Sequence, residues 1–192
     1  YLDDDKTDRI EMIGKSYRFR IKNPIGWRGT HLNGGWHSQQ NIHKKKIFSK
    51  LNNLIFNTIK TNIIPEHYSI DESRRQIKTD QMSIDSAWVV INGLHDRNQL
   101  HTHIGTWLTG VFYIQIPENM KGGNLVIHDT NPVRKHEDWI HKSRYGVKYD
   151  IKPKEGMLVL FPSWVPHLVT PGDTEEDRIC YSFTINYLNK LR

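Results

Sequence analysis

The chain has 192 residues, a net charge of +6 and 36% hydrophobic residues, which suits one globular domain able to bury a core without disulfides or a structural metal. It has no apolar run of the roughly 18–20 residues that a membrane-spanning helix needs, and no basic start followed by an apolar stretch of the kind that marks a signal peptide. The single cysteine, Cys180, excludes an internal disulfide and favours a reducing, cytoplasmic setting.

The N-terminal part is expected to form a layer of strand and helix. Tyr17, Phe19 and Ile21 alternate with basic residues, which predicts a strand with one buried face. A loop rich in glycine and tryptophan follows. From about residue 41 to 61, apolar side chains recur at three- and four-residue spacing, which predicts an amphipathic helix packed against a sheet, with Asn41 as its N-cap.

From Ser86 onward, short apolar segments alternate with glycine and proline. Short strands at this spacing are typical of a jelly roll or barrel, so we predict a mainly β fold with supporting helices. We expect a single domain over residues 1–192, with residues 1–85 as a supporting layer and 86–192 as the jelly-roll core. The predicted strands cover residues 87–91, 108–116, 124–128, 157–161 and 178–187.

Three histidines are the strongest candidates for a metal site. His101 and His103 lie two residues apart just before a predicted strand, where an extended chain points both imidazoles to the same face. His167 follows another strand, and an antiparallel jelly roll can return it to the same place. Imidazole binds iron, zinc, copper and nickel. Three protein ligands leave positions on the metal open, as a catalytic site requires.

Arg178 opens the last predicted strand, and Ser182 shares its face because side chains alternate along a strand. An arginine on a core strand needs an anion to offset its burial, and a carboxylate that accepts two parallel hydrogen bonds suits it best. A simpler explanation is an ion pair with the neighbouring Asp177 or Glu176. The sequence leaves both explanations open.

These residues occur in an order that resembles a known family. The order is His101-x-His103, Gly110-Val111-Phe112-Tyr113, Gly122-Gly123-Asn124-Leu125, Gly156-Met157-Leu158-Val159-Leu160-Phe161-Pro162-Ser163-Trp164, His167 and Arg178. Together with Gly35-Trp36-His37-Ser38-Gln39, it is similar to the 2-oxoglutarate/Fe(II) dioxygenase superfamily. More narrowly, it resembles oxygenases of bacteria and phages that are distant relatives of prolyl hydroxylases. The resemblance covers about residues 35–186, and the segment from Gly156 to His167 is its most specific part.

The resemblance implies a double-stranded β-helix with a cupin-like core. It also implies an enzyme, a hydroxylase that depends on Fe(II), 2-oxoglutarate and O2, releases succinate and CO2, and acts on a peptidyl side chain or a small molecule. The metal and catalytic positions that it implies are His101, His103 and His167. The positions that it implies for the far carboxylate of 2-oxoglutarate are Arg178, Tyr113 and Ser182.

One metal position departs from the family pattern. The superfamily usually has an acidic residue two positions after the first histidine, whereas this chain has His103. Three neutral imidazoles leave iron with more positive charge, which shifts its redox potential and its affinity for the cofactor. One alternative is that a carboxylate from Asp96 or Asp129 binds the metal in place of His103. A second alternative is a halogenase-like site, in which His103-Ile104-Gly105 leaves a metal position open for chloride.

Two other functions therefore stay open. One is a three-histidine, cupin-type dioxygenase that does not use 2-oxoglutarate. The other is a non-catalytic jelly-roll module that binds a sugar, a peptide or another protein, with the metal as a structural element.

Aromatic residues near these ligands are candidates for a substrate-binding wall. We assign this role to Trp107 and Trp164, and to His37 in the N-terminal loop. The other loop histidines, among them His31, are expected in packing or surface positions. The long polar segment 130–149 is a candidate lid.

The basic charge attracts anions, but it does not by itself predict a nucleic-acid site. Lys44-Lys45-Lys46 and Arg74-Arg75 are short and lack interleaved aromatic residues, and both features argue against nucleic acid as a partner. We expect a small-molecule or peptide substrate and no membrane association. A free jelly-roll edge leaves the oligomeric state open.

Overall fold

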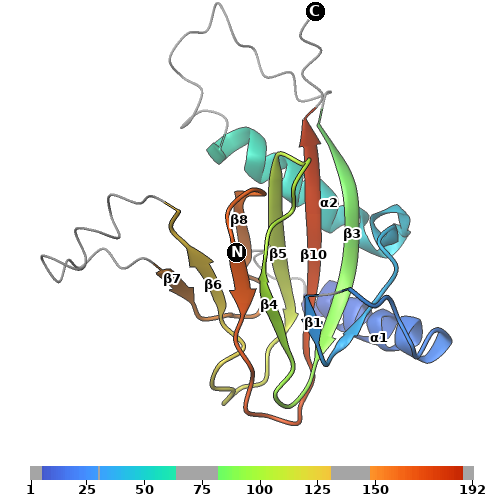
Figure 1. Cartoon of the computed structure of the whole chain (residues 1–192). Coiled ribbons are helices and arrows are strands. Elements are labelled where there is room, and N and C mark those ends of the chain that lie inside the picture. Colours follow the sequence, from blue (N-terminus) through green and yellow to red (C-terminus); the bar gives the residue numbers. More distant parts are fainter. Residues whose placement is uncertain (1–5, 30, 64–81, 131–147, 188–192) are drawn as a thin grey trace, which may run out of the picture.

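The computed structural model describes residues 6–29, 31–63, 82–130 and 148–187 (Figure 1). Two antiparallel five-stranded sheets form the jelly roll that the sequence predicts. The first sheet runs in the order β1 (Leu32–Asn33), β4 (Arg97–His101), β9 (His167–Val169), β6 (Leu125–His128) and β7 (Lys148–Ile151). The second runs in the order β2 (Trp36–His37), β3 (Met82–Asn92), β10 (Arg178–Tyr187), β5 (Leu108–Gln115) and β8 (Leu158–Pro162).

The two faces of the second sheet bury two different cores. On β10, Ile179, Tyr181 and Phe183 belong to a core shared with the helices, whereas Cys180 belongs to a smaller core between the sheets. The two-residue period of a strand produces this division. Burial of apolar surface on both faces explains why the predicted strands of this sheet are nearly continuous hydrophobic runs.

The predicted amphipathic helix is present, but it begins with irregular turns. Two short 3₁₀ segments, Ile42–Lys44 and Lys46–Phe48, precede α2 (Ser49–Thr58), and a π-helical turn at Ile59–Ile63 follows it. The predicted stripe is buried, because Phe48, Leu51, Ile55 and Ile59 are at most 1% exposed. Asn41 makes no capping hydrogen bond through its side chain, so that part of the prediction is wrong.

The predicted strand around Tyr17 is also wrong, because this segment is the end of α1 (Lys6–Lys22). Met12 and Ser16 are buried one helical turn apart, and the Ser16 hydroxyl donates to the Met12 carbonyl at 2.7 Å. Ile21, predicted to face the core, is 75% exposed. Six alternating residues are too few to distinguish the two periods, and the helical period appears only when Met12 is included.

Figure 1 shows α1 and α2 against the second sheet, on the side away from β4. None of the helices in the described part of the chain combines the length and the apolar character needed to cross a membrane. Most of the candidate lid, residues 131–147, lies outside the described residues.

Candidate metal centre and cofactor pocket

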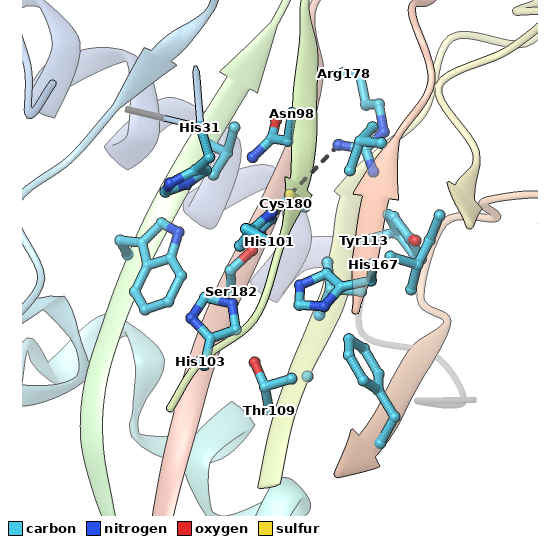
Figure 2. A pocket seen from close by; sticks show the side chains of 17 residues that line it. His31, Asn98, His101, His103, Thr109, Tyr113, His167, Arg178, Cys180 and Ser182 are labelled. Atoms are coloured by element: carbon cyan, nitrogen blue, oxygen red, sulfur yellow. Dashed lines mark hydrogen bonds between the residues drawn. The ribbon is translucent and has the colours of Figure 1, made fainter. Parts of the chain in front are cut away.

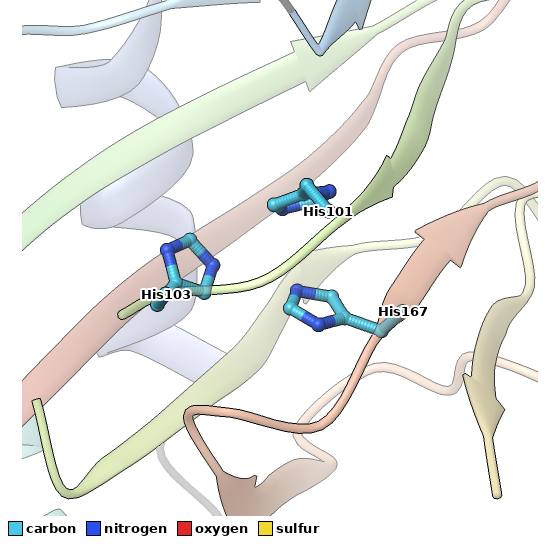
Figure 3. Close-up of side chains that lie close together, drawn as sticks. All are labelled: His101, His103 and His167. Atoms are coloured by element: carbon cyan, nitrogen blue, oxygen red, sulfur yellow. The ribbon is translucent and has the colours of Figure 1, made fainter. Parts of the chain in front are cut away.

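The three predicted histidines lie together at the meeting of β4 and β9 (Figure 3). His101 ends β4 and is the register partner of His167, which opens β9. His103 lies two residues beyond β4, where its backbone N–H donates to the Ser163 carbonyl at 2.9 Å. One ring nitrogen from each histidine lies within 4.8 Å of the corresponding nitrogens of the other two. Segments far apart in sequence thus present three imidazoles to one point.

Backbone carbonyls orient two of these rings. Nδ1 of His101 lies 2.7 Å from the Gln99 carbonyl oxygen, and Nδ1 of His167 lies 3.0 Å from the Val165 carbonyl oxygen. A carbonyl oxygen only accepts, so Nδ1 of each ring carries the hydrogen and Nε2 keeps a free lone pair. Orientation of this kind is the usual support of a metal-binding histidine.

The three imidazoles are neutral at neutral pH. Burial, together with the smaller effects of the neighbouring His101 and His167, lowers the pKa of His103 to about 3. Burial and the charge of His101 lower the pKa of His167 to about 4, against a smaller opposite effect of the Val165 carbonyl. Burial likewise lowers the pKa of His101, and its hydrogen bond to Gln99 opposes the shift. Neutral imidazole is the form that binds metal.

The cluster opens into a pocket between the sheets, with about 520 Å³ of space not filled by atoms. Figure 2 shows Arg178, Cys180, Ser182 and Tyr113 lining the pocket together with the histidines. Among the described residues no carboxylate lines it, so its fixed charge is that of one guanidinium.

Arg178 is buried in this pocket without an ion pair to any described carboxylate. It is 3% exposed, and its Nη1 makes a long contact of 3.5 Å with the Cys180 sulfur. Its Nε has no hydrogen-bond partner among the described residues. Asp177, the simpler partner suggested by the sequence, instead pairs with Arg20 at 3.1 Å. A buried guanidinium left unpaired is costly, and an anion bound in the pocket would offset that cost.

Tyr113 faces the same space. The Arg178 guanidinium carbon lies 5.1 Å from the centre of its ring, and its hydroxyl is buried without a hydrogen-bond partner among the described residues. Burial raises the pKa of Tyr113 to about 12, although the Arg178 charge opposes this effect. The phenol therefore stays protonated at neutral pH and keeps a hydrogen that it can donate.

His31 and Asn98 line the pocket although the sequence analysis did not place them there. The His31 ring stacks on His101, with 4.3 Å between ring centres and 17° between the planes. The pairing of β1 with β4 brings it there, and the His31 carbonyl accepts from Gln99 N–H at 2.7 Å. The sequence did not predict β4, because its five residues, Arg97–His101, have no hydrophobic alternation. Without β4, the position of His31 beside His101 could not be predicted either.

The three residues predicted to contact substrate are not brought together at this pocket. His37 is buried and stacks on Trp88, a lining residue, at 5.3 Å between ring centres. Trp107 packs on Tyr187 at 5.5 Å, and Trp164 is 61% exposed. None of the three is among the pocket's lining residues, and their substrate roles stay predictions. Asp96, the alternative ligand, accepts from the Gly93 N–H at 2.8 Å.

The sequence and the fold were compared with known proteins. A family model described as "Putative 2OG-Fe(II) oxygenase" matches residues 86–184, which is just over half of the chain. No curated protein matches the chain. Among solved structures, a prolyl-4-hydroxylase of Pseudomonas putida is similar, with a TM-score of 0.64, 14% identity, and coverage of 94% of this chain and 86% of the hydroxylase.

Two further structures are similar over nearly the whole chain. The viral collagen prolyl hydroxylase of Paramecium Bursaria Chlorella virus-1, in its 2-oxoglutarate complex, has a TM-score of 0.59 and 13% identity, with coverage of 94% of this chain and 90% of that one. HygX of Streptomyces hygroscopicus, with nickel and 2-oxoglutarate bound, has a TM-score of 0.61 and 9% identity, with coverage of 97% and 80%.

At these identities the structural likeness establishes the fold. The family match goes further, since the matched residues include His101, His103 and His167. The chain therefore belongs to the 2OG-Fe(II) oxygenases, enzymes that depend on Fe(II), 2-oxoglutarate and O2.

Proposed function

We propose that His101, His103 and His167 hold Fe(II), and that Arg178, Tyr113 and Ser182 bind the far carboxylate of 2-oxoglutarate. In this proposal the enzyme hydroxylates a peptidyl side chain or a small molecule and releases succinate and CO2. The observation that carries the assignment is that Arg178 Nε and the Tyr113 hydroxyl are buried without a hydrogen-bond partner among the described residues, in the pocket that the three histidines also line.

The residues fit the cofactors chemically. Three neutral imidazoles suit Fe(II), and a guanidinium beside a phenol suits a carboxylate. When bound, iron and 2-oxoglutarate together supply the oxidising chemistry that places one atom of O2 in the substrate and the other in succinate. The protein holds the cofactor in one orientation and excludes water with the apolar side chains of Val111, Leu125 and Phe161.

Each polar residue has a distinct task in this arrangement. Arg178 supplies a fixed positive charge and a planar set of donors. Tyr113 supplies a neutral donor, because its raised pKa keeps the hydroxyl protonated. Ser182 follows Cys180 along the same face of β10, with its oxygen 3.8 Å from the Cys180 sulfur, and offers a second hydroxyl to the pocket.

Calorimetric titration of 2-oxoglutarate into the Ni(II)-loaded protein tests the assignment. Arg178→Ala should weaken 2-oxoglutarate binding by at least about 30-fold, because truncating one partner of a buried charge pair costs about 2 kcal/mol or more. The control ligand is 2-oxopentanoate, which keeps the keto acid and lacks the far carboxylate. Its affinity should change little between the two proteins. An equal loss for both ligands would mean that Arg178 only supports the fold.

Turnover provides the second test. Fe(II)-loaded protein given 2-oxoglutarate and then O2 should release succinate slowly without added substrate, and Arg178→Ala should not. The all-imidazole metal set favours one competing function, a dioxygenase that needs iron but not 2-oxoglutarate. Absence of succinate together with absence of 2-oxoglutarate binding would support that competitor.

A further inference from the structure

The charge of this chain is strongly segregated. Residues 12–65 contain ten Lys and Arg and no Asp or Glu, whereas the other residues contain 17 Lys and Arg against 21 Asp and Glu. The modest net charge of +6 therefore hides a segment of +10. This segment forms most of α1, the loop that carries β1 and β2, and α2 with its flanking turns.

Part of this segment surrounds a second groove, with about 860 Å³ of space not filled by atoms. The groove lies between the second half of α1 and the residues that follow β2. Three lysines line it, and no acidic residue does. Its lining residues are Lys15, Lys22 and Lys45, the aromatic Phe19 and Trp36, and the polar Asn23, Ser38, Gln39 and Asn41, together with Ile42.

The groove lysines are not neutralised within the described part of the chain. Among the described residues, two basic side chains of this segment form ion pairs, Arg20 with Asp177 and Lys50 with Asp8. None of the described ion pairs includes a groove lysine. Lys15 lies over the Phe19 ring, 5.8 Å from its centre. A cation held by an aromatic face rather than by a carboxylate remains free to attract an anion.

The groove is separate from the cofactor pocket. Trp36 and His37 are adjacent on β2, so their side chains point to opposite faces of the second sheet. Trp36 lines the groove, whereas His37 stacks on Trp88, which lines the pocket. A ligand in the groove would therefore occupy the helix-covered face, beside the edge strand β2.

We propose that this groove binds single-stranded nucleic acid. Lysines neutralise phosphates, the partly exposed Phe19 ring can contact a base, and side-chain amides can meet base edges. A cationic groove with an aromatic contact is a usual means of binding a single strand. Cations also continue past the groove, since Lys44 and Lys46 flank Lys45 and are exposed. That continuation favours a polymer over a single nucleotide. The site goes beyond the proposed oxygenase function and needs no change in it.

The sequence argued against nucleic acid because its lysine clusters lack neighbouring aromatic residues. The fold supplies one from elsewhere, since Phe19 on α1 lies beside the groove lysines. Trp36 on β2 also lines the groove, but it is 6% exposed and donates its indole N–H to the Asn23 carbonyl, so it forms part of the groove wall. Concavity and amide groups also distinguish this groove from a flat cationic face of the kind that suits a membrane surface.

Fluorescence anisotropy with labelled single strands of about twelve nucleotides tests the proposal, because one strand-binding module covers about 4–16 nucleotides. The test variant is Lys15→Gln/Lys22→Gln/Lys45→Gln in the full chain. The matched control is Lys121→Gln/Lys148→Gln/Lys152→Gln, which removes the same charge at exposed sites. Lys148 lies on β7, on the opposite side of the molecule from α1 in Figure 1. Melting temperatures of both variants check folding, and Lys22→Gln/Lys45→Gln, with two exposed side chains, replaces the triple variant if that one melts early.

The groove variant should bind at least about tenfold more weakly than the control variant at about 0.1 M salt. It should also lose about 2 units of the slope of log affinity against log salt, since each phosphate contact on a single strand contributes about 0.7. Phe19→Leu should weaken binding of the strand but not of heparin, a polyanion without bases. Equal losses in both lysine variants, equal Phe19→Leu effects on heparin, or displacement of the strand by a mononucleotide at similar concentration would each overturn the proposal.

Discussion

At the scale of single residues, the unusual feature is the proposed set of metal ligands. Where its superfamily usually has a carboxylate, this chain has His103, whose backbone N–H donates a hydrogen bond to the Ser163 carbonyl. The ring has no acidic neighbour among the lining residues of the pocket. An incoming Fe(II) would therefore keep its full positive charge.

Replacing His103 tests whether it is a ligand. His103→Ala should weaken Ni(II) or Co(II) binding by more than about 100-fold, because even the residues that only support metal ligands cost about 10–100-fold when removed. His103→Asp should retain binding, since a carboxylate restores a donor and adds negative charge. Calorimetric titration of each metal measures both variants. Unchanged affinity in His103→Ala would remove this residue from the site.

His37 should make the apoprotein sensitive to acid. Burial lowers the pKa of His37 to about 4, with a small opposite effect of the Ser38 carbonyl. Between about pH 6.5 and pH 4, this histidine is protonated in the unfolded chain, where its pKa is near 6.5, but stays neutral in the folded protein. The free energy of unfolding therefore falls as the pH drops through this range. The part due to His37 should be about 2 kcal/mol at pH 5.

The variant His37→Phe keeps a ring against Trp88 and removes the titration. The free energies of unfolding of wild type and variant should be measured in urea at pH 7 and at pH 5. Between pH 7 and pH 5, the wild type should lose about 2 kcal/mol more than the variant. The same difference at both pH values would mean that His37 does not titrate in this way.

At the scale of elements, α1 is where sequence pattern and structure disagree. The alternation of Tyr17, Phe19 and Ile21 predicts a strand, yet the segment is helical and buries Met12 and Ser16. The contacts of the helix with the core decide the outcome, since propensity over six residues is a weak signal.

Two truncations distinguish helix from strand at this position. Met12→Ala should lower the free energy of unfolding by about 2–5 kcal/mol, because Met12 is 2% exposed. Ile21→Ala should change it by less than about 0.5 kcal/mol, because Ile21 is 75% exposed. Urea unfolding measures both. A loss at Ile21 as large as that at Met12 would favour the strand.

At the scale of the whole molecule, the pocket joins the two sheets. The histidines lie on or beside β4 and β9 of the first sheet, whereas Arg178, Tyr113 and Ser182 lie on β10 and β5 of the second. In the proposed complex, residues of the first sheet would hold the metal and residues of the second would hold the far carboxylate of 2-oxoglutarate, so the bound ligands would link the two sheets. Ligand binding should therefore raise the stability of the whole fold.

Thermal unfolding with ligands checks this arrangement. Ni(II) alone should raise the melting temperature, and 2-oxoglutarate should raise it further only when Ni(II) is present. Each ligand at about 100 times its Kd contributes about 2.7 kcal/mol. In Arg178→Ala the metal effect should persist and the added effect of 2-oxoglutarate should largely disappear. Stabilisation by 2-oxoglutarate without metal would contradict the bridging arrangement.

The sequence by itself determined the jelly-roll class, the five apolar strands and α2, because continuous hydrophobic runs and helical spacing are local patterns that burial rewards directly. Its side-chain chemistry also singled out the three histidines and Arg178 as site candidates, whereas Tyr113 became a candidate only through the family resemblance.

Only the tertiary structure decided the rest. The strands β4 and β9, which carry His101 and His167, are short and form by pairing with neighbouring strands rather than by a pattern of their own. Whether Arg178 has a carboxylate partner, whether His31 stacks on His101, and whether lysines meet aromatic rings all depend on residues distant in sequence. Such contacts are properties of the packed chain, because the folding of several elements, and not the local sequence, sets which side chains share a space.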